Sequence, residues 1–279
     1  MLRTDYPLTL ICQVLNLPRS TLYYAARTPD ETVERQAISA VAEQFPTYGS
    51  RRIAAQLRRS PYRLVVSRKR AGRIMRELGL LRQHRPRARR TTDSQHQFGR
   101  FPNLVVDRVA SVPDEIWVSD ITYIRLGDGF IYLAIILDVY TRDIRGWHLG
   151  RTLAQELTLS ALRQALERTR PQIHHSDQGI QYAAPHYVQL LRAAGVQVSM
   201  TAAGEPTQNG YAERVIRTIK EEEVALTEYR DFADAKAQIG RFIDDVYRTK
   251  RIHSALGYLT PAEFEAAWQQ VQRNPIASH

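Results

Sequence analysis

Cysteine is almost absent from this sequence of 279 residues, and several classes of protein are excluded by what is missing. The single Cys12 excludes an internal disulfide and cannot form a cysteine-rich zinc site by itself. There is no run of eighteen or more apolar residues, so no segment is expected to span a bilayer. The N-terminus also lacks the apolar run and cleavage site of a signal peptide. We therefore expect an intracellular, cytoplasmic protein of bacterial character, with one large domain or two modest ones.

Acidic residues are scarce in the first third of the chain, and basic residues are concentrated there. Residues 1–103 contain 20 Lys and Arg against 7 Asp and Glu, whereas residues 104–279 contain 19 against 22. The formal net charge of +10 favours a polyanionic partner, most simply nucleic acid, although an anionic membrane surface would attract the same charge. Because the sign reverses along the chain, we expect the first third to bind DNA or RNA and the remainder to have another task.

Two short helices are predicted within residues 7–27. Apolar residues recur at helical spacing from Leu8 to Leu15, and "NLPRS" then interrupts the pattern, with Pro18 suited to an early position of a second helix. Two short helices joined by a tight turn are the layout of a helix-turn-helix, whose second helix can enter a major groove. Any small helical hairpin would show the same pattern, so both interpretations stay open for a unit at residues 1–28.

A second all-α unit is predicted at residues 30–81. Its apolar stripes predict three helices, the last of them at residues 67–81 with Ser67 as its N-cap and Gly79 as its stop. Exposed basic side chains are often only solvated, but two basic faces in one small unit favour contact with phosphates. The basic stretch that follows has no periodicity, so residues 82–103 are predicted to be a flexible linker. The candidate DNA-contacting residues of this unit are Arg51, Arg52, Arg68, Lys69 and Arg70.

After Asn103 the β-branched and aromatic residues become frequent. Three strands are predicted first, and the second of them is so apolar that it should be central in a sheet. Helices and strands then alternate, which predicts an α/β domain at residues 104–279 with a mixed five-stranded sheet covered on both faces and with C-terminal helices. The predicted strands lie at residues 115–126, 130–140, 143–150, 172–177 and 196–200, and the first two helices lie at residues 154–169 and 185–195.

Two aspartates in this domain are candidates for chemistry. Asp120 lies inside an apolar strand, where a carboxylate is costly unless a metal or a partner compensates its charge. Asp177 follows the short strand in "HHSDQGIQY", and ligands of α/β sheets favour the carboxyl ends of strands. Gly179 would let the backbone turn closely there. The alternatives are a strand-edge Asp120 bonded to a backbone group or an arginine, and a turn without function at Asp177.

The stretch "TQNGYAERVIRTIKEE" at residues 207–222 predicts an amphipathic helix that begins near Gly210. Glu213 lies in its first turn, where the preceding polar loop could direct it toward a site at the end of the sheet. The carboxylates of residues 221–223 come two turns later and are expected to be solvated. The predicted buried stripe is Ala212, Val215, Ile216 and Ile219, and the face that carries Glu213 also carries Asn209, Arg217 and Lys220.

Two aspartates and a glutamate from separate elements would suit a hard divalent ion. Mg²⁺ prefers oxygen ligands, and waters or phosphate oxygens complete its coordination. Two such ions can activate a water or a 3′-hydroxyl and stabilise the leaving oxygen of an in-line attack on phosphorus. The spacing of the three acids is compatible with this chemistry but does not prove it.

Taken together, these motifs resemble those of the DDE transposases and integrases of the retroviral-integrase superfamily. The acids follow in the order Asp120, Asp177 and Glu213, with 35 residues between the last two. Lys220 follows Glu213 by seven positions, which is similar to the D,D(35)E signature with its basic residue. "RIHSALGYLTPAEF" at residues 251–264 resembles the C-terminal segment of the family. The block that begins "FPTYGSRRI" resembles the helix-turn-helix that precedes the core in insertion-sequence transposases encoded by two reading frames.

The resemblance implies an RNase H-like core in a transposase that cleaves and transfers DNA strands during insertion-sequence transposition. It implies that Asp120, Asp177 and Glu213 are catalytic ligands of Mg²⁺ or Mn²⁺, with two ions, and that Lys220 contacts DNA. For His253, a structural role is an equal alternative to a DNA contact. The further positions with implied supporting or DNA-contacting roles are Asn209, Tyr182, Arg217, Arg251 and His253.

The resemblance also implies partners, and the sequence differs from the family pattern at two positions. Element ends and target DNA are the expected ligands, synapsis implies a homo-oligomer, and the product of an upstream reading frame is a possible partner. Gly210 stands where the family usually has alanine, and Arg248 stands where asparagine is expected, which leaves the subfamily open. Two other functions remain as alternatives: a catalytically silent DNA-binding derivative, and an RNase H-type nuclease that acts on hybrids.

Overall fold

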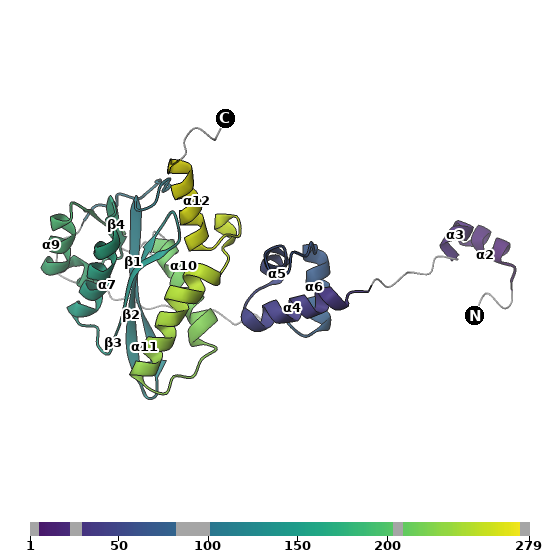
Figure 1. The fold of residues 1–279 in the computed structure, drawn as a ribbon, viewed down its shortest axis with the longest axis horizontal. Helices are drawn as coiled ribbons and strands as arrows, with labels where there is room; N and C mark the ends of the chain where they lie inside the picture. The colour runs from purple at the N-terminus through teal and green to yellow at the C-terminus, as the bar shows by residue number, and fades with distance from the viewer. Residues whose placement is uncertain (1–5, 23–29, 82–100, 203–208, 274–279) are drawn as a thin grey trace.

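The computed structural model describes residues 6–22, 30–81, 101–202 and 209–273 (Figure 1). Its largest part is a five-stranded sheet with the strand order β3-β2-β1-β4-β5. The sheet confirms the predicted mixed α/β architecture and the order of its elements. Its strands are β1 (Ile116–Leu126), β2 (Gly129–Asp138), β3 (Ile144–Gly150), β4 (Ile173–Ser176) and β5 (Gln197–Met200).

The strand directions divide the sheet into two halves. β1, β2 and β3 form an antiparallel meander, whereas β4 pairs in parallel with β1 and β5 pairs in parallel with β4. This is the strand arrangement expected of the RNase H-like fold. As predicted, the apolar β2 is an interior strand, and Leu133 to Asp138 are buried. Because β1 lies between β2 and β4, the carboxyl end of the short β4 meets the middle of β1.

Helices cover both faces of the sheet (Figure 1). One face packs on α10 and α11, and the other packs on α7 and α9. At Gly146 in β3 the sheet and α7 are so close that a Cβ atom would clash with the carbonyl oxygen of Ala161. The helices of this part are α7 (Gln155–Arg168), α8 (Ile180–Ala183), α9 (Pro185–Ala193), α10 (Gly210–Ile219), η2 (Lys220–Val224), α11 (Phe232–Arg241), η3 (Phe242–Lys250), η4 (Ser254–Leu256) and α12 (Pro261–Arg273).

A separate helical unit precedes the sheet and has its own apolar core. It contains α4 (Thr32–Gln44), α5 (Ser50–Leu57) and α6 (Arg68–Glu77). Ser67 caps α6 as predicted, because its Oγ accepts a hydrogen bond from the backbone N–H of Arg70 at 3.2 Å. α6 ends before Gly79, which takes the predicted left-handed conformation with φ of 68°.

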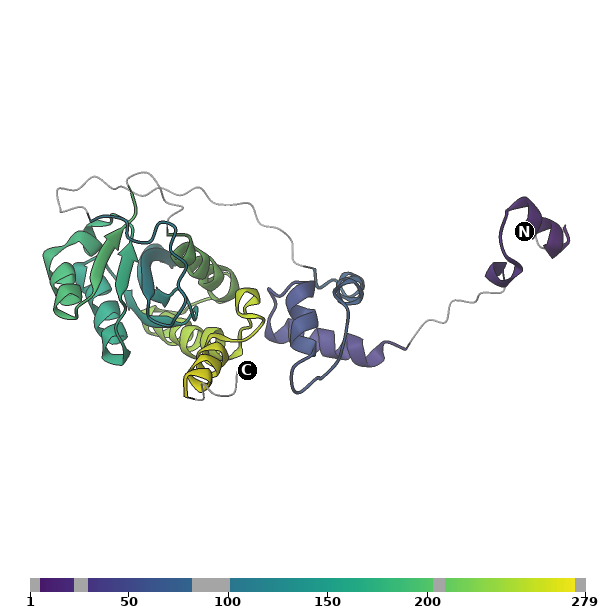
Figure 2. The same ribbon diagram turned by 90° about the horizontal axis from the view of Figure 1, so that it is seen from above.

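The helical unit is joined to the sheet domain by a segment that is distant in the sequence. Ile252, between η3 and η4, is fully buried in the core of the helical unit, and its backbone N–H donates to the hydroxyl of Tyr48 at 2.9 Å. Arg59 also pairs with Glu263 of α12. Figure 2 shows the helical unit beside these C-terminal helices. Residues 104–279 were predicted as a core domain with C-terminal helices, and a segment among those helices also completes the packing of the helical unit.

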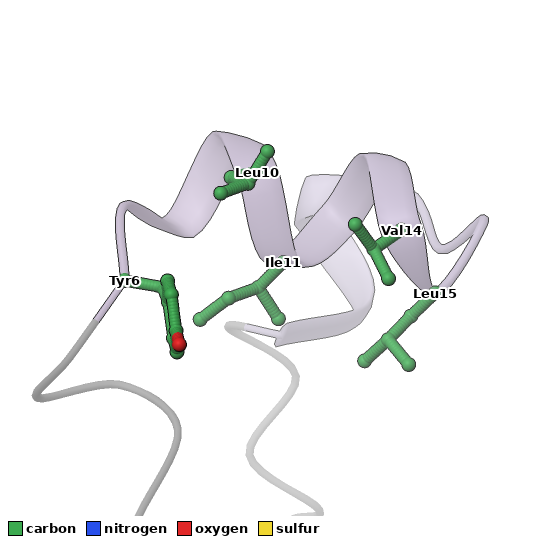
Figure 3. Close-up of a pocket in the computed structure, with 5 residues that line it drawn as sticks. All are labelled: Tyr6, Leu10, Ile11, Val14 and Leu15. Atoms are coloured by element: carbon green, nitrogen blue, oxygen red, sulfur yellow. The ribbon is translucent and has the colours of Figure 1, made fainter.

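The N-terminal residues contain the two predicted short helices, α2 (Leu8–Val14) and α3 (Arg19–Leu22). The apolar side chains of α2 and its flanks line an open hollow of about 210 Å³ (Figure 3). Residues 23–28 of this predicted unit and residues 82–100 of the predicted linker lie outside the described residues. Within the described ranges, no helix is both long and apolar enough to cross a membrane.

Candidate active site

The register of two parallel strands brings Asp120 and Asp177 together. The last residue pair between β1 and β4 is Ser119 with Ser176. Asp120 and Asp177 directly follow this last pair in the two parallel segments, so they lie side by side where β4 ends. Asp120 is only 5% exposed, whereas Asp177 is half-buried at the start of the loop. The sequence identified each aspartate as a candidate on its own, and the strand register shows that their positions are adjacent.

Backbone amides orient both carboxylates. The Oδ1 of Asp120 accepts a hydrogen bond from the N–H of Ile121 at 2.8 Å. The Oδ1 of Asp177 accepts one from the N–H of Gly179 at 3.0 Å. A Cβ atom on Gly179 would lie 2.9 Å from the same Oδ1 atom, so glycine permits the close turn that the sequence predicted. Hydrogen bonds to the charged form of a carboxylate stabilise it and restrict its rotation.

A buried tyrosine lies behind the two aspartates. Tyr182 is 2% exposed, and burial raises the pKa of its phenol well above the usual value. The neighbouring Tyr187 and the charges of Asp120 and Asp177 raise this pKa further. Tyr182 therefore stays a neutral phenol, and both carboxylates lie near enough to influence its pKa. The supporting role that the resemblance implies for Tyr182 stays a prediction.

The start of α10 is attached to β1 next to Asp120. The Nδ2 of Asn209 donates a hydrogen bond to the carbonyl oxygen of Ser119 at 2.9 Å. This acceptor determines the orientation of the amide, because only the NH₂ group can donate. The guanidinium of Arg142, in the loop after β2, lies 4.0 Å from the ring centroid of Tyr211 in the first turn of α10. These two contacts fix the position of the helix that carries Glu213.

Glu213 lies in the first turn of α10 and is half-buried. The predicted stripe of Ala212, Val215, Ile216 and Ile219 is buried against the sheet, as expected. On β1, Val118 and Ile124 belong to the same apolar cluster. Because side chains alternate along a strand, Asp120 projects from this same face. α10 therefore covers the side of the sheet on which Asp120 lies.

The carboxylates of this site are the type of ligand that Mg²⁺ prefers, but they do not form a complete set of metal ligands in this structure. Among the described residues there is no group of three or more His, Cys, Asp or Glu side chains that could hold a metal ion. Two adjacent carboxylates fit the preference of Mg²⁺ for hard oxygen ligands, with waters or phosphate oxygens to complete the sphere. The buried Oδ1 of Asn209 has no hydrogen-bond partner among the described residues, which leaves an acceptor for a group that enters the site. The ligand set with Glu213 stays a prediction.

Comparison with known proteins identifies the family of the chain. Residues 110–206 and 194–261 match two families described as integrase core domain, and residues 29–89 match an HTH-like domain. The chain is 33% identical to the insertion element IS600 uncharacterized 31 kDa protein of Shigella sonnei, over 94% of this chain and 99% of that protein. It belongs to the insertion-sequence transposases with an integrase core.

Two further relatives have names that agree with this family. The transposase for insertion sequence element IS904 of Lactococcus lactis is 32% identical over 86% of this chain and 97% of its own length. The transposase for IS629 of Shigella sonnei is 30% identical over 96% and 94%. The alignments therefore include the helical unit as well as the sheet domain. The resemblance inferred from the motifs is confirmed.

The basic residue predicted after Glu213 is Lys220, which directly follows α10 as the first residue of η2. The Nζ of Lys220 lies 4.6 Å from the ring centroid of Tyr123, near the end of β1. A cation above an aromatic face is attracted by the ring, and this contact holds Lys220 beside the sheet. Arg217 is exposed, one turn after Glu213. The predicted DNA contacts of Lys220 and Arg217 stay predictions.

The expectation that the carboxylates after α10 are solvated is wrong for Glu222 and Glu223. Glu222 accepts two hydrogen bonds from Arg251, at 2.6 and 2.7 Å, and lies 3.3 Å from a guanidinium nitrogen of Arg52. Burial raises the pKa of Glu223, which also accepts a hydrogen bond from Tyr229. The helical periodicity could not reveal this, because the helical unit and the C-terminal segment that cover Glu222 are distant in the sequence.

Several predicted DNA-contacting residues lie inside the protein. Arg251 is 3% exposed and pairs with Glu222, and Asn209 is equally buried. His253 packs against Tyr247, with ring centroids 5.0 Å apart, and burial and then the charge of Arg251 lower its pKa to about 2. The neutral imidazole favours the structural alternative for His253.

The basic residues of the helical unit differ in their contacts. Arg51, Arg68 and Lys69 are exposed, so DNA could reach them. Arg52 is engaged with Glu222, and Arg70 pairs with Glu31 and Glu34 at 3.0 and 2.9 Å. A guanidinium held in an ion pair loses part of its attraction for a phosphate.

Arg248, which stands where the family usually has asparagine, forms an ion pair in the structure. Its Nε lies 3.5 Å from the Oδ2 of Asp143, which is 1% exposed and is also paired with Arg145. A buried carboxylate requires compensation of its charge, and Arg248 contributes part of it. Sequence reasoning missed this group, as it missed Arg142, because charge compensation depends on contacts between distant segments.

Proposed function

We propose that this chain catalyses metal-dependent DNA strand cleavage at the ends of its insertion sequence and the transfer of those strands into target DNA. The observation that supports this most directly is the adjacent position of Asp120 and Asp177, covered by the helix that carries Glu213, in a member of the transposase family. A polynucleotidyl transfer needs little covalent participation by protein groups, and carboxylates at such a position would hold the metal ions that organise it.

Asp120, Asp177 and Glu213 would hold Mg²⁺ or Mn²⁺, and we propose two ions. When bound, such ions lower the pKa of a water or 3′-hydroxyl nucleophile and stabilise charge on the leaving oxygen. The chain contributes the positioning. Amide hydrogen bonds orient both aspartates, and Asn209 and Arg142 hold the start of α10 beside β1.

The exposure of each basic side chain indicates which residues could contact DNA. We propose that the exposed or half-exposed basic groups bind the phosphate backbone, which determines register on the duplex but carries no sequence information. The buried Asn209 and Arg251 and the half-buried His253, all at motif positions, would support these groups by positioning α10 and the helical unit. The proposed phosphate contacts are Arg51, Arg68, Lys69, Arg217 and Lys220.

Synapsis of two element ends requires at least two active sites, so we propose a homo-oligomer in the reacting complex. The relatives are bacterial proteins, and we place the reaction in the cytoplasm, at the nucleoid. The participation of a protein from an upstream reading frame stays a prediction, which co-purification from cells that carry the whole element would test.

The test uses the purified chain, labelled duplexes with element ends, and Mn²⁺ or Mg²⁺. Asp120→Asn, Asp177→Asn and Glu213→Gln should each reduce cleavage at least about a thousandfold, a change of about 4 kcal/mol in transition-state stabilisation, while DNA binding is retained. Glu228→Gln is the matched control, because Glu228 is exposed. Undiminished strand transfer by the Asp120 or Glu213 variant would refute the assignment.

The same assay separates the two alternative functions. A catalytically silent derivative would bind the ends and cleave nothing with either metal. An RNase H-type nuclease would cleave an RNA–DNA hybrid and leave the duplex ends intact. Either result would contradict the proposed transposase reaction.

A further inference from the structure

A polar cleft lies at the junction of the helical unit and the sheet domain. It has a volume of about 320 Å³, which is at the lower end of the range for small-ligand pockets. Its walls come from the start of α5 on one side and from the outer face of α10 on the other. Apart from Gly49, every lining residue is polar or charged, and the principal ones are Thr47, Arg52, Arg214, Arg217, Glu222 and Arg251.

Positive charge exceeds negative charge in this cleft. Four arginines and two glutamates line it, and Glu222 is already shared by Arg251 and Arg52. Arg214 and Arg217 are exposed, and neither has an ion-pair partner among the described residues. The pKa of Arg52 is lowered by burial and next by the charge of Arg251, and Arg214 adds to the effect. An anion in the cleft would relieve this repulsion between guanidinium groups.

The start of α5 adds a second source of attraction for anions. The N-cap residue is Gly49, which lines the cleft and has no side chain to accept hydrogen bonds from the first-turn amides of this eight-residue helix. Uncapped amides and the helix dipole favour a negatively charged group at this position. Thr47 lies on the same wall. The two domains therefore present complementary halves of one anion site.

The cleft lies beside the candidate active site along α10. Arg217 follows Glu213 by four residues, so their Cα atoms are separated by about 6 Å along the helix axis. A duplex whose reacting phosphodiester lies at the acids would place a neighbouring part of its backbone at the cleft. This relation rests on the proposed function, because it takes DNA as the substrate.

We propose that the cleft binds one phosphodiester group of duplex DNA, which is held jointly by α5 of the helical unit and by Arg214 and Arg217 of α10. Occupation of the cleft connects the two domains through the DNA backbone at a point next to the reacting strand. The contact is independent of base sequence, because a phosphate is the same at every position. Arg214 and Thr47, which no motif singles out, become residues of the DNA interface.

The test compares Arg214→Gln with Arg170→Gln in the full chain. Arg170 is exposed in the loop before β4, so the control removes the same charge at a distance from the cleft. Binding of a fluorescein-labelled duplex is followed by anisotropy from low to moderate salt. Arg214→Gln should weaken binding about threefold to tenfold, equally for element ends and unrelated sequences, and reduce the slope of log K against log salt by about 0.9. Thr47→Val should weaken binding by a smaller factor in the same direction.

The outcomes separate this site from the proposed reaction. If Arg214→Gln and Arg170→Gln have the same affinity and the same salt slope, the cleft is not a phosphate site, whatever the catalytic assay shows. If Arg214→Gln lowers the affinity for duplex DNA and the slope of log K against log salt while the wild-type chain cleaves no DNA, the phosphate site is supported and the proposed reaction is refuted. Circular dichroism of each variant checks that the fold is intact, which is expected because Arg214 is exposed and has no ion-pair partner among the described residues.

Discussion

Glu222 connects the two domains, and neutralising it should have a large effect on stability. Its carboxylate accepts both hydrogen bonds of a bidentate pair with Arg251 and lies near Arg52. The side chains of Glu222 and Arg251 are 11% and 4% exposed. The substitution Glu222→Gln preserves the shape and one acceptor but removes the charge. The guanidinium of Arg251 would then be buried without a counter-charge and would face that of Arg52.

The expected cost follows from this burial. Removal of one partner from a buried ion pair costs about 3–5 kcal/mol, because the remaining charge cannot be solvated. We take the lower limit, about 3 kcal/mol, because glutamine retains a hydrogen bond and Arg52 is partly exposed. This corresponds to a change of about 150-fold in the equilibrium constant for separation of the two domains. The chemistry at Asp120 and Asp177 is not directly touched.

The measurement combines urea unfolding with hydrogen exchange of the Ile252 amide, which donates to Tyr48 across the domain boundary. Glu222→Gln should lower both the free energy of unfolding and the protection of this amide, whereas Glu228→Gln should change neither by more than about 0.5 kcal/mol. Replacing the pair together, with Glu222→Leu and Arg251→Met, should recover much of the loss. A Glu222→Gln variant as stable as the Glu228→Gln control would refute the reasoning.

Two further predictions concern the stability of the sheet domain. Burial lowers the pKa of His174 to about 3 and that of His253 to about 2. In the unfolded chain both imidazoles have a pKa near 6.5, so as the pH falls below 6.5 the unfolded chain binds a proton at each histidine and the folded chain does not. Their contribution to stability is complete above about pH 6.5 and falls as the pH decreases toward 3, by up to about 1.4 kcal/mol per pH unit for each histidine. Urea unfolding at pH 7.5 and 5.5 measures this, and a constant free energy of unfolding would contradict it. Gly146→Ala should cost about 3 kcal/mol, because its Cβ would clash with α7, whereas Gly129→Ala should be nearly neutral in the same assay.

Most elements of the sheet domain follow from local patterns. The apolar run of β2 predicted an interior strand, and the stripe on α10 predicted its buried face correctly. Asp120 and Asp177 were identified because each is a carboxylate in an unusual local setting. What local pattern could not supply was the pairing of β1 with β4, since that contact joins residues more than fifty positions apart in the chain.

The errors of prediction have a common physical origin. Glu222 was expected in solvent and Arg251 at DNA, yet they form a buried ion pair. A helical wheel identifies which residues share a face, but it does not identify what covers that face. Here the covering groups are Arg52 from the helical unit and the segment around Ile252, whose side chain completes the core of that unit.

The amino-acid sequence by itself determined the charge division between the two parts of the chain, the order of the helices and strands, and the three acids that resemble a DDE set. These properties depend on residue type and on short-range spacing, which a single sequence displays. Only the tertiary structure decided that Asn209 attaches the start of α10 to β1, that Arg142 contacts the first turn of α10, that Arg251 and Ile252 join the domains, and that a cleft lined by arginines lies between them. The reason is that burial and charge pairing depend on which distant segments meet, and that information is contained in the packing of the folded chain.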